Sequence, residues 1–170
     1  MNRVKEGHLA ELSELFERYH VRIYNFILKL TYDRSVSQDL TQNLFYRIIK
    51  YRRSFNDAYT FKSWIYQLAR NIHADHRKKN KTLSDQYTSV DKYDDNTIME
   101  NTEFIEEDYE RLEKALAKLR PDQKEIIVLS RFQGLKYNEI SAIQNTSVPA
   151  IKVQVHRAIK ELRNYYFKLI

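Results

Sequence analysis

Apolar residues recur at helical spacing along most of the chain, and polar stretches separate the helices that this spacing predicts. In the N-terminal half the pattern predicts a long amphipathic helix over residues 9–30 and two shorter helices over residues 37–51 and 61–79. Residues 33–35 interrupt the pattern and offer a helix cap, and residues 52–60 have the composition of a loop. Three helices with short connections predict a small bundle.

The middle of the chain lacks this periodicity. Residues 81–107 are rich in Asp, Asn, Thr, Ser and Glu, so we expect a flexible acidic linker with a short helical turn around residues 97–104. The helical pattern resumes at Asp108, passes Pro121, which suits the first turn of a helix, and stops at Gly134.

Two helices over residues 137–144 and 148–167 complete the predicted set. Only two glycines and two prolines occur in 170 residues, whereas an all-β fold needs many tight turns. The expected fold class is therefore all-α, with a helical bundle in residues 1–80, the linker in residues 81–107 and a helix-turn-helix domain in residues 108–170.

Charge is distributed unevenly along these segments. Residues 1–80 carry 15 Lys and Arg against 8 Asp and Glu, residues 81–110 carry 2 against 10, and residues 111–170 carry 12 against 5. Two basic segments thus flank an acidic one, and basic segments attract polyanions, of which nucleic acid is the commonest in the cytoplasm. Solvated helix faces would give the same pattern, so charge alone leaves both interpretations open.

The residue types that are missing narrow the possibilities. The sequence has no cysteine, which excludes disulfides and thiolate metal sites. No stretch is apolar over the length that a membrane span needs, and the N-terminus has no apolar signal-peptide core. We therefore expect a cytoplasmic protein without membrane insertion and without a cofactor.

The last two predicted helices have the spacing of a helix-turn-helix. Asn145 occupies the turn, where a left-handed backbone is needed, Ser147 can cap the second helix, and Pro149 fits its first turn. One face of the second helix is apolar, whereas the opposite face is basic and amide-bearing with small or aliphatic residues between. Such a face suits the major groove of DNA. The alternative is an ordinary helical hairpin with a solvated basic face.

This segment resembles region four of the bacterial RNA polymerase sigma factors. The resemblance rests on GLKYNEISAI (residues 134–143) and VPAIKVQVHRAIKELR (residues 148–163), although the family more often has glycine where this chain has Asn145 and Pro149. It implies that the helix-turn-helix reads the minus-thirty-five promoter element and that its neighbourhood docks on the polymerase flap. The positions that correspond to DNA-facing residues of the family are Ala150, Lys152, Val153, Gln154, His156, Arg157 and Lys160.

A second resemblance lies in the N-terminal half. DLTQNLFYRIIK (residues 39–50) resembles the helix by which sigma region two binds the coiled coil of the polymerase clamp. The resemblance implies that core polymerase is bound by Asp39, Gln42, Asn43 and Tyr46, with Asn43 standing where an acidic residue is usual.

FKSWIYQLARNIHADHRKK (residues 61–79) is similar to the sigma element that reads and melts the minus-ten DNA. Melting requires that unstacked bases be held by aromatic or amide groups beside a basic track for the single strand. The loop before this helix offers such groups at Phe55, Asn56 and Tyr59, whereas the helical spacing of Trp64 favours a place in the core over a base-stacking role. The residues expected to bind and melt minus-ten DNA are Asn56, Tyr59, Trp64, Arg70, Asn71, His73, Arg77 and Lys78.

The order of these motifs along the chain is that of the family. The chain has no room for the extra regions of a housekeeping sigma factor, so it is most similar to the small two-domain extracytoplasmic-function group. That resemblance implies three partners: core RNA polymerase, which is bound through its clamp coiled coil and flap, promoter DNA, and an anti-sigma factor.

Two other functions are possible from the residues alone. His73, Asp75 and His76 lie on one predicted helix at a spacing that can bring two ligands to a metal ion, but no other acidic or histidine cluster completes a site and the neighbouring charges are cationic. A stand-alone helix-turn-helix regulator with a helical dimerisation or ligand domain would also explain the C-terminal segment. Such a regulator has no need of the clamp-like segment, residues 39–50.

Overall fold

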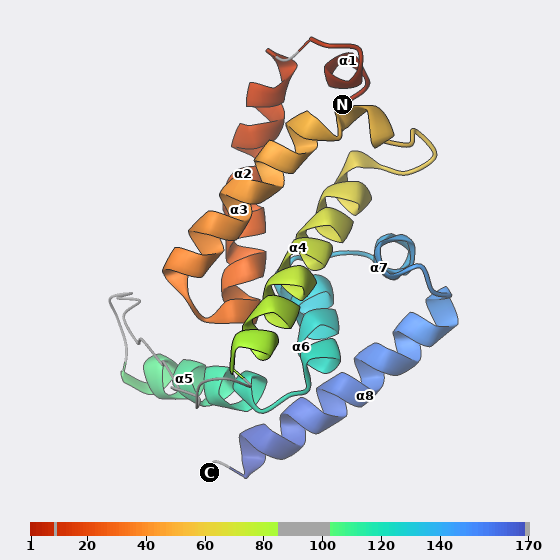
Figure 1. Ribbon diagram of the computed structural model, residues 1–170. Coiled ribbons are helices and arrows are strands. Elements are labelled where there is room, and N and C mark those ends of the chain that lie inside the picture. The colour runs from red at the N-terminus through yellow and green to blue at the C-terminus, as the bar shows by residue number, and fades with distance from the viewer. Residues whose placement is uncertain (9, 85–102, 169–170) are drawn as a thin grey trace. The chain divides into compact units, whose positions relative to one another are not determined.

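The computed structural model describes residues 1–8, 10–84 and 103–168, and these residues form helices and connecting loops without a β-strand (Figure 1). The all-α fold class is thereby confirmed. Contacts divide the chain into two compact units, residues 1–93 with 142–144 and residues 94–141 with 145–170. Residues 85–102 of the predicted acidic linker lie outside the described residues, and of the helical turn expected around residues 97–104 only Glu103 and Phe104 are described, where they begin α5.

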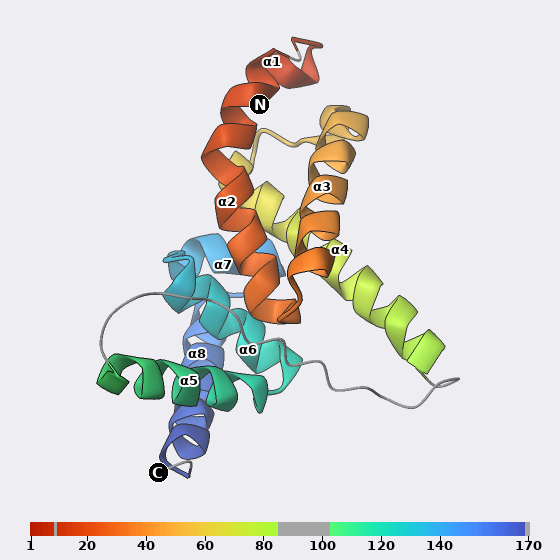
Figure 2. The ribbon, with the colours of Figure 1, turned by 90° about the vertical axis from the view of Figure 1, so that its left-hand side faces the viewer.

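The first unit is built on three helices, α2 (Glu11–Thr31), α3 (Arg34–Lys50) and α4 (Phe61–Ser84). Helices α2 and α3 lie side by side and α4 packs against both of them (Figures 1 and 2). Tyr32 closes α2 in the left-handed conformation with φ 57°, and Asp33 begins α3 because its Oδ1 accepts a hydrogen bond from the Val36 amide at 2.9 Å. The cap that the sequence indicated at residues 33–35 is therefore present.

Apolar residues at helical spacing form the core of this unit, as the pattern predicted. All three long helices contribute side chains that are almost completely buried. The largest of them are Ile23, Phe26, Ile27, Leu44, Ile48, Ile65, Tyr66 and Ile72.

The N-terminal residues form a short helix that the pattern did not predict. Helix α1 (Asn2–Lys5) comes before α2, and the predicted first helix begins at Glu11 rather than at residue 9. A four-residue helix is too short to display a periodic apolar stripe, so its one buried residue, Val4, gave no signal. The loop after α3 begins with a 3₁₀ turn, η1 (Arg52–Ser54), which α1 contacts.

The second unit contains α5 (Glu103–Ala117), α6 (Pro121–Ile127), the π-helical turn η2 (Val128–Phe132), α7 (Tyr137–Gln144) and α8 (Val148–Phe167). The bounds of α7 and α8 are those predicted, whereas α5 starts five residues before the predicted helix. In the first unit α4 also runs beyond the predicted residue 79, to Ser84. The residues added at the start of α5 and at the end of α4 are mostly polar and form no apolar stripe, so the periodic pattern did not predict them as helical.

Helices α5 and α6 both pack on α8. Buried Leu116, Ile126, Leu129 and Val155 belong to this core. The single helix predicted to end at Gly134 widens into the π-helical turn η2, in which Ser130 donates its hydroxyl hydrogen to the Ile126 carbonyl at 2.7 Å. None of the helices in the described parts of the chain combines the length and the hydropathy that a membrane span requires.

Candidate functional site

The turn between α7 and α8 has the geometry that the helix-turn-helix prediction requires. Asn145 lies in the left-handed region with φ 50° and ψ 50°, and its amide donates to the Ser141 carbonyl. Ser147 then begins α8, where its Oγ accepts a hydrogen bond from the Ala150 amide at 3.4 Å, and Pro149 lies in the first turn. Both the left-handed turn and the cap are confirmed at the residues predicted for them.

Helix α8 buries one face and exposes the other. Ile151, Val155 and Ala158 are buried, so the face opposite them is free of the core. On that face Val153 is 48% exposed despite being apolar, and Ala150 is half-buried. The remaining predicted residues, Lys152, Gln154, His156, Arg157 and Lys160, are all exposed. The seven residues predicted to contact DNA thus lie together on accessible parts of one helix.

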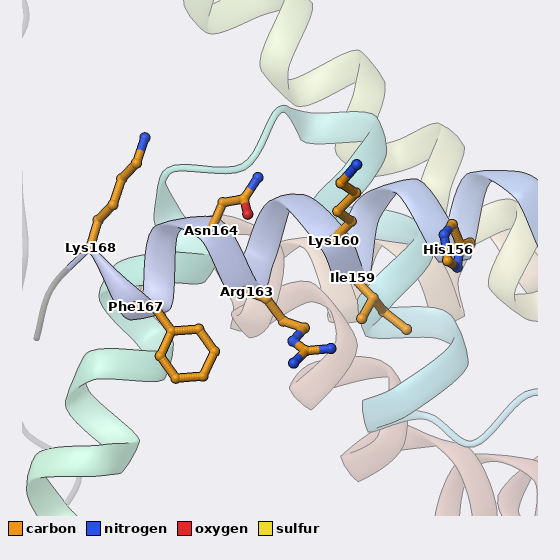
Figure 3. A pocket seen from close by; sticks show the side chains of 7 residues that line it. All are labelled: His156, Ile159, Lys160, Arg163, Asn164, Phe167 and Lys168. Carbon is orange, nitrogen blue, oxygen red and sulfur yellow. The ribbon is translucent and has the colours of Figure 1, made fainter.

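The exposed surface continues along the C-terminal half of α8 (Figure 3). A hollow of about 840 Å³ lies beside this half of the helix. Its lining consists of three Lys or Arg side chains, one histidine, one amide side chain and two apolar side chains. The lining residues are His156, Ile159, Lys160, Arg163, Asn164, Phe167 and Lys168. Two of them, His156 and Lys160, were predicted from the sequence, and Arg163 and Lys168 extend the basic surface beyond the predicted set.

The residues predicted to bind polymerase form a stripe on α3. Asp39, Gln42, Asn43 and Tyr46 follow one another at intervals of three, one and three residues, which places them on one helical face, and all four are exposed. Tyr46 is 60% exposed, which is a large exposed fraction for an aromatic side chain and is typical of a residue that contacts a partner. Asn43 Oδ1 accepts a hydrogen bond from Arg47 Nε at 3.2 Å, and Arg47 also pairs with Asp75 of α4 at 3.5 Å.

The loop before α4 begins in an aromatic cluster. Phe55 is only 5% exposed, and its ring centroid lies 5.4 Å from that of Trp64, which in turn lies 5.9 Å from Phe61. Trp64 is therefore half-buried among aromatic rings. Asn56 and Tyr59 are exposed, and Asn56 Oδ1 accepts a hydrogen bond from the Ala58 amide at 2.9 Å.

Helix α4 presents most of the predicted basic track to solvent. Asn71, Arg77 and Lys78 are exposed and Arg70 is half-buried. His73 differs because it is 8% exposed and, like its neighbour Ile72, is buried in the bundle. Its spacing of four residues from the buried Ala69 is the sequence signal for this inward position.

Asp75, which the sequence placed near two histidines, pairs with Arg47. In the described part of the chain no group of three or more His, Cys, Asp or Glu residues is arranged to hold a metal ion.

Two family profiles match the chain, one in each half. The profile described as Sigma-70 region 2 matches residues 15–82, which include α3, the loop and most of α4. The profile described as Sigma-70, region 4 matches residues 109–162, which include the helix-turn-helix. The chain belongs to the sigma-70 family.

Relatives of this sigma factor include members of the extracytoplasmic-function group. It is 28% identical over 158 residues to the ECF RNA polymerase sigma factor SigM of Bacillus subtilis, with 91% of this chain and 94% of the relative covered. It is 26% identical over 163 residues to the RNA polymerase sigma factor CarQ of Myxococcus xanthus, with 96% and 93% covered. The predicted family and group are confirmed.

Solved structures share the fold of this sigma factor. The sigma factor RpoE from Bartonella quintana, in complex with the anti-sigma factor NepR, matches with a TM-score of 0.75 at 21% identity and covers 91% of this chain and 96% of its own. CnrH in complex with the cytosolic domain of CnrY matches with a TM-score of 0.72 at 18% identity and covers 96% and 92%.

The predicted sites of this sigma factor fall inside the two matched segments, whereas α1 does not. The region 2 match begins at residue 15, so α1 and the first turn of α2 precede it. Val4 is an isolated apolar position in the sequence, so no pattern indicates a role for these residues.

Proposed function

We propose that this sigma factor binds core RNA polymerase through the α3 stripe and directs the complex to its promoters. The observation that carries this proposal is the stripe itself, because Asp39, Gln42, Asn43 and Tyr46 are exposed together on a helix whose other faces pack in the bundle. Carboxylate, amide and aromatic groups in a row supply the hydrogen-bonding and apolar contacts typical of a protein interface. A factor acting in this way works in the cytoplasm as a binding subunit, without catalysis of its own.

Promoter DNA is the second proposed partner, contacted by both units. The exposed face of α8 offers Lys152, Gln154 and Arg157 to the minus-thirty-five element, since such side chains bind phosphates and base edges. The loop with Asn56 and Tyr59, and the track of Arg70, Asn71, Arg77 and Lys78 on α4, would hold the melted minus-ten strand. Trp64 contributes by supporting the loop through its contact with Phe55. His73, being buried, fits an indirect role better than contact with the strand.

An anti-sigma factor is the third proposed partner. The solved sigma factors RpoE and CnrH are described in complexes with NepR and with the cytosolic domain of CnrY, and NepR is named as an anti-sigma factor. A shared fold and a shared family support regulation of this chain by a protein of the same kind. Binding of such a partner to the α3 stripe or to α8 would exclude polymerase or DNA.

The test is co-elution of the purified chain with core RNA polymerase from its own source on a sizing column. We expect a one-to-one complex with the wild-type protein. Asp39→Ala and Gln42→Ala should each weaken it roughly tenfold or more, because a hydrogen bond to a charged group contributes about 1.5–3 kcal/mol. Glu17→Ala is the matched control, since Glu17 is an exposed carboxylate on α2, outside the stripe.

Two outcomes would contradict the proposal. Equal binding of core polymerase by wild type, the two stripe variants and the control would show that the α3 stripe is not the polymerase-binding surface. Elution of the chain alone as a dimer that binds promoter DNA without polymerase would instead support a stand-alone helix-turn-helix regulator.

A further inference from the structure

Helix α1 is anchored to the first unit although it precedes the segment that the region 2 profile matches. Val4 is completely buried, and α1 contacts both α2 and η1. An ion pair of 3.0 Å between Arg3 and Glu11 adds a second attachment to α2. Both views show α1 at the N-terminal end of α2 (Figures 1 and 2). A terminal segment usually frays unless packing holds it, so these contacts fix α1 in one place.

Lys5 joins α1 to the loop that precedes α4. Its Nζ donates a hydrogen bond to the Phe55 carbonyl at 3.0 Å and lies 3.8 Å from Asp57 Oδ1. The two partners flank Asn56, the first of the two exposed loop residues proposed to hold melted DNA. The Lys5 ammonium group therefore restrains the backbone of Phe55, which precedes Asn56, and the side chain of Asp57, which follows it.

The loop has few restraints of its own. Within the loop, Tyr59 N donates to the Asn56 carbonyl at 3.1 Å and Ala58 N donates to Asn56 Oδ1 at 2.9 Å. Both of these bonds end on Asn56, so a restraint that fixes Asn56 also places Ala58 and Tyr59. Phe55 is fixed on its inner side by the aromatic cluster, and Lys5 fixes it from the α1 side.

A hollow of about 470 Å³ lies where α1, the start of α2 and this loop meet. Its three carboxylates each have an ion-pair partner: Glu11 with Arg3 at 3.0 Å, Glu14 with Arg18 at 2.6 Å and Asp57 with Lys5 at 3.8 Å. The remaining lining includes Tyr59, Phe61 and Leu15. A hollow with balanced charge and aromatic walls suits an uncharged planar ring better than a phosphate.

We infer that α1 is part of the promoter-melting site and that Lys5 is a positioning residue, which holds the 55–59 loop in the shape that accepts an unpaired base. The inference rests on the proposed role of that loop in melting. Lys5 acts through the loop rather than by binding DNA itself, because its ammonium group is already engaged by Phe55 and Asp57. Removal of that group frees the loop and lowers the fraction of time in which the base site is formed.

The test compares Lys5→Met with wild type in complexes of the full chain with core polymerase on duplex promoter DNA. Methionine keeps the apolar stem and removes the charge. We expect unchanged co-elution with core polymerase and open-complex formation about three- to tenfold slower, as loss of one charge-assisted hydrogen bond would cause. Lys5→Arg retains the donors and should restore the rate. Lys118→Met is the matched control and should behave as wild type, because Lys118 is an exposed lysine outside the 55–59 loop, α3 and α8.

Lys5 could act by positioning the loop or by binding the DNA backbone directly. Promoters that each lack one base in the minus-ten element distinguish these two roles. In wild type, the position with the largest loss identifies the captured base. At that position Lys5→Met should cause almost no further loss, because the contact that it supports is already missing. A full additional loss there would mean that Lys5 binds the DNA backbone directly, and would overturn the inference.

The same experiment distinguishes failure of the inference from failure of the proposed function. If wild type shows no dependence on any minus-ten base, the melting role of the loop is wrong. If wild type depends on one base and Lys5→Met melts duplex DNA at the wild-type rate, the melting role stands and the role of α1 is wrong. Thermal unfolding of each variant verifies that α1 and the first unit remain folded.

Discussion

Single side chains decide where several helices of this sigma factor begin and end. Asp33 accepts a hydrogen bond from the Val36 amide at the start of α3, and Ser147 accepts one from the Ala150 amide at the start of α8. Asn145 closes α7 with a left-handed backbone, which a short polar side chain tolerates better than a branched one. Such local interactions depend on residues three or four positions apart, so they can be predicted from the sequence.

The cap at Asp33 can be measured by substitution. Asp33→Ala should lower the free energy of unfolding of the first unit by about 1 kcal/mol, because an amide of α3 loses its acceptor. Asp33→Asn keeps an acceptor oxygen and should change it by only a few tenths. Trp64 is the single tryptophan of the chain and lies in this unit, so its fluorescence during urea unfolding reports the change. Equal stability of Asp33→Ala and wild type would contradict the role of the cap.

At the scale of the element, function depends on which face of a helix is left uncovered. The apolar stripe of α8 is buried at Ile151, Val155 and Ala158, and this burial fixes the rotation that exposes Gln154 and Arg157. In α3 burial of Leu44 and Ile48 similarly leaves the stripe from Asp39 to Tyr46 outward. A single helical period thus assigns both a core face and a binding face.

Arg157 tests the binding face of α8. Arg157→Ala should weaken promoter binding by the complex of this sigma factor with core polymerase by about 1–3 kcal/mol, since an arginine that contacts a base or phosphate contributes about that much. Its binding to core polymerase should not change. Transcription from a mapped promoter in vitro gives the readout. Arg131→Ala is the control because Arg131 is an exposed arginine of the same unit outside α8. A similar loss in both variants would refute a specific role for the α8 face.

At the scale of the whole molecule, promoter binding is spread over two basic segments. Residues 1–80 and 111–170 each carry a net charge of +7, so contacts with phosphates can form from both. Release of counterions from the DNA makes such binding weaken steeply as salt rises. The distribution of charge therefore predicts a salt dependence shared between the units.

The contribution of α8 to these phosphate contacts can be tested by substitution of its lysines. The affinity of the sigma–polymerase complex for promoter DNA is measured at several salt concentrations for wild type and for the double variant Lys152→Ala with Lys160→Ala. The slope of log K against log salt should become less steep by about 2, because each lost phosphate contact changes it by about 0.9. Lys118→Ala, at an exposed lysine outside α8, should leave the slope unchanged. An unchanged slope in the double variant would mean that these lysines do not contact phosphate.

The sequence by itself determined the helices that are long and amphipathic, their caps and the faces they expose. The bounds of α7 and α8 and the left-handed turn at Asn145 follow from periodicity and local hydrogen bonds, whereas the residues of the α3 stripe were implied by the resemblance to sigma region two. These features depend on neighbours within one or two helical turns, and the order of the motifs was sufficient to indicate the family.

Only the tertiary structure decided the features that depend on distant residues. The packing of Val4 gives α1 its place, and the bond from Lys5 to Phe55 joins residues fifty positions apart. The ring contacts of Trp64 and the inward position of His73 likewise depend on how α4 packs in the bundle. Contacts over such separations leave no periodic trace in the sequence, because they arise from packing between elements rather than from spacing within one.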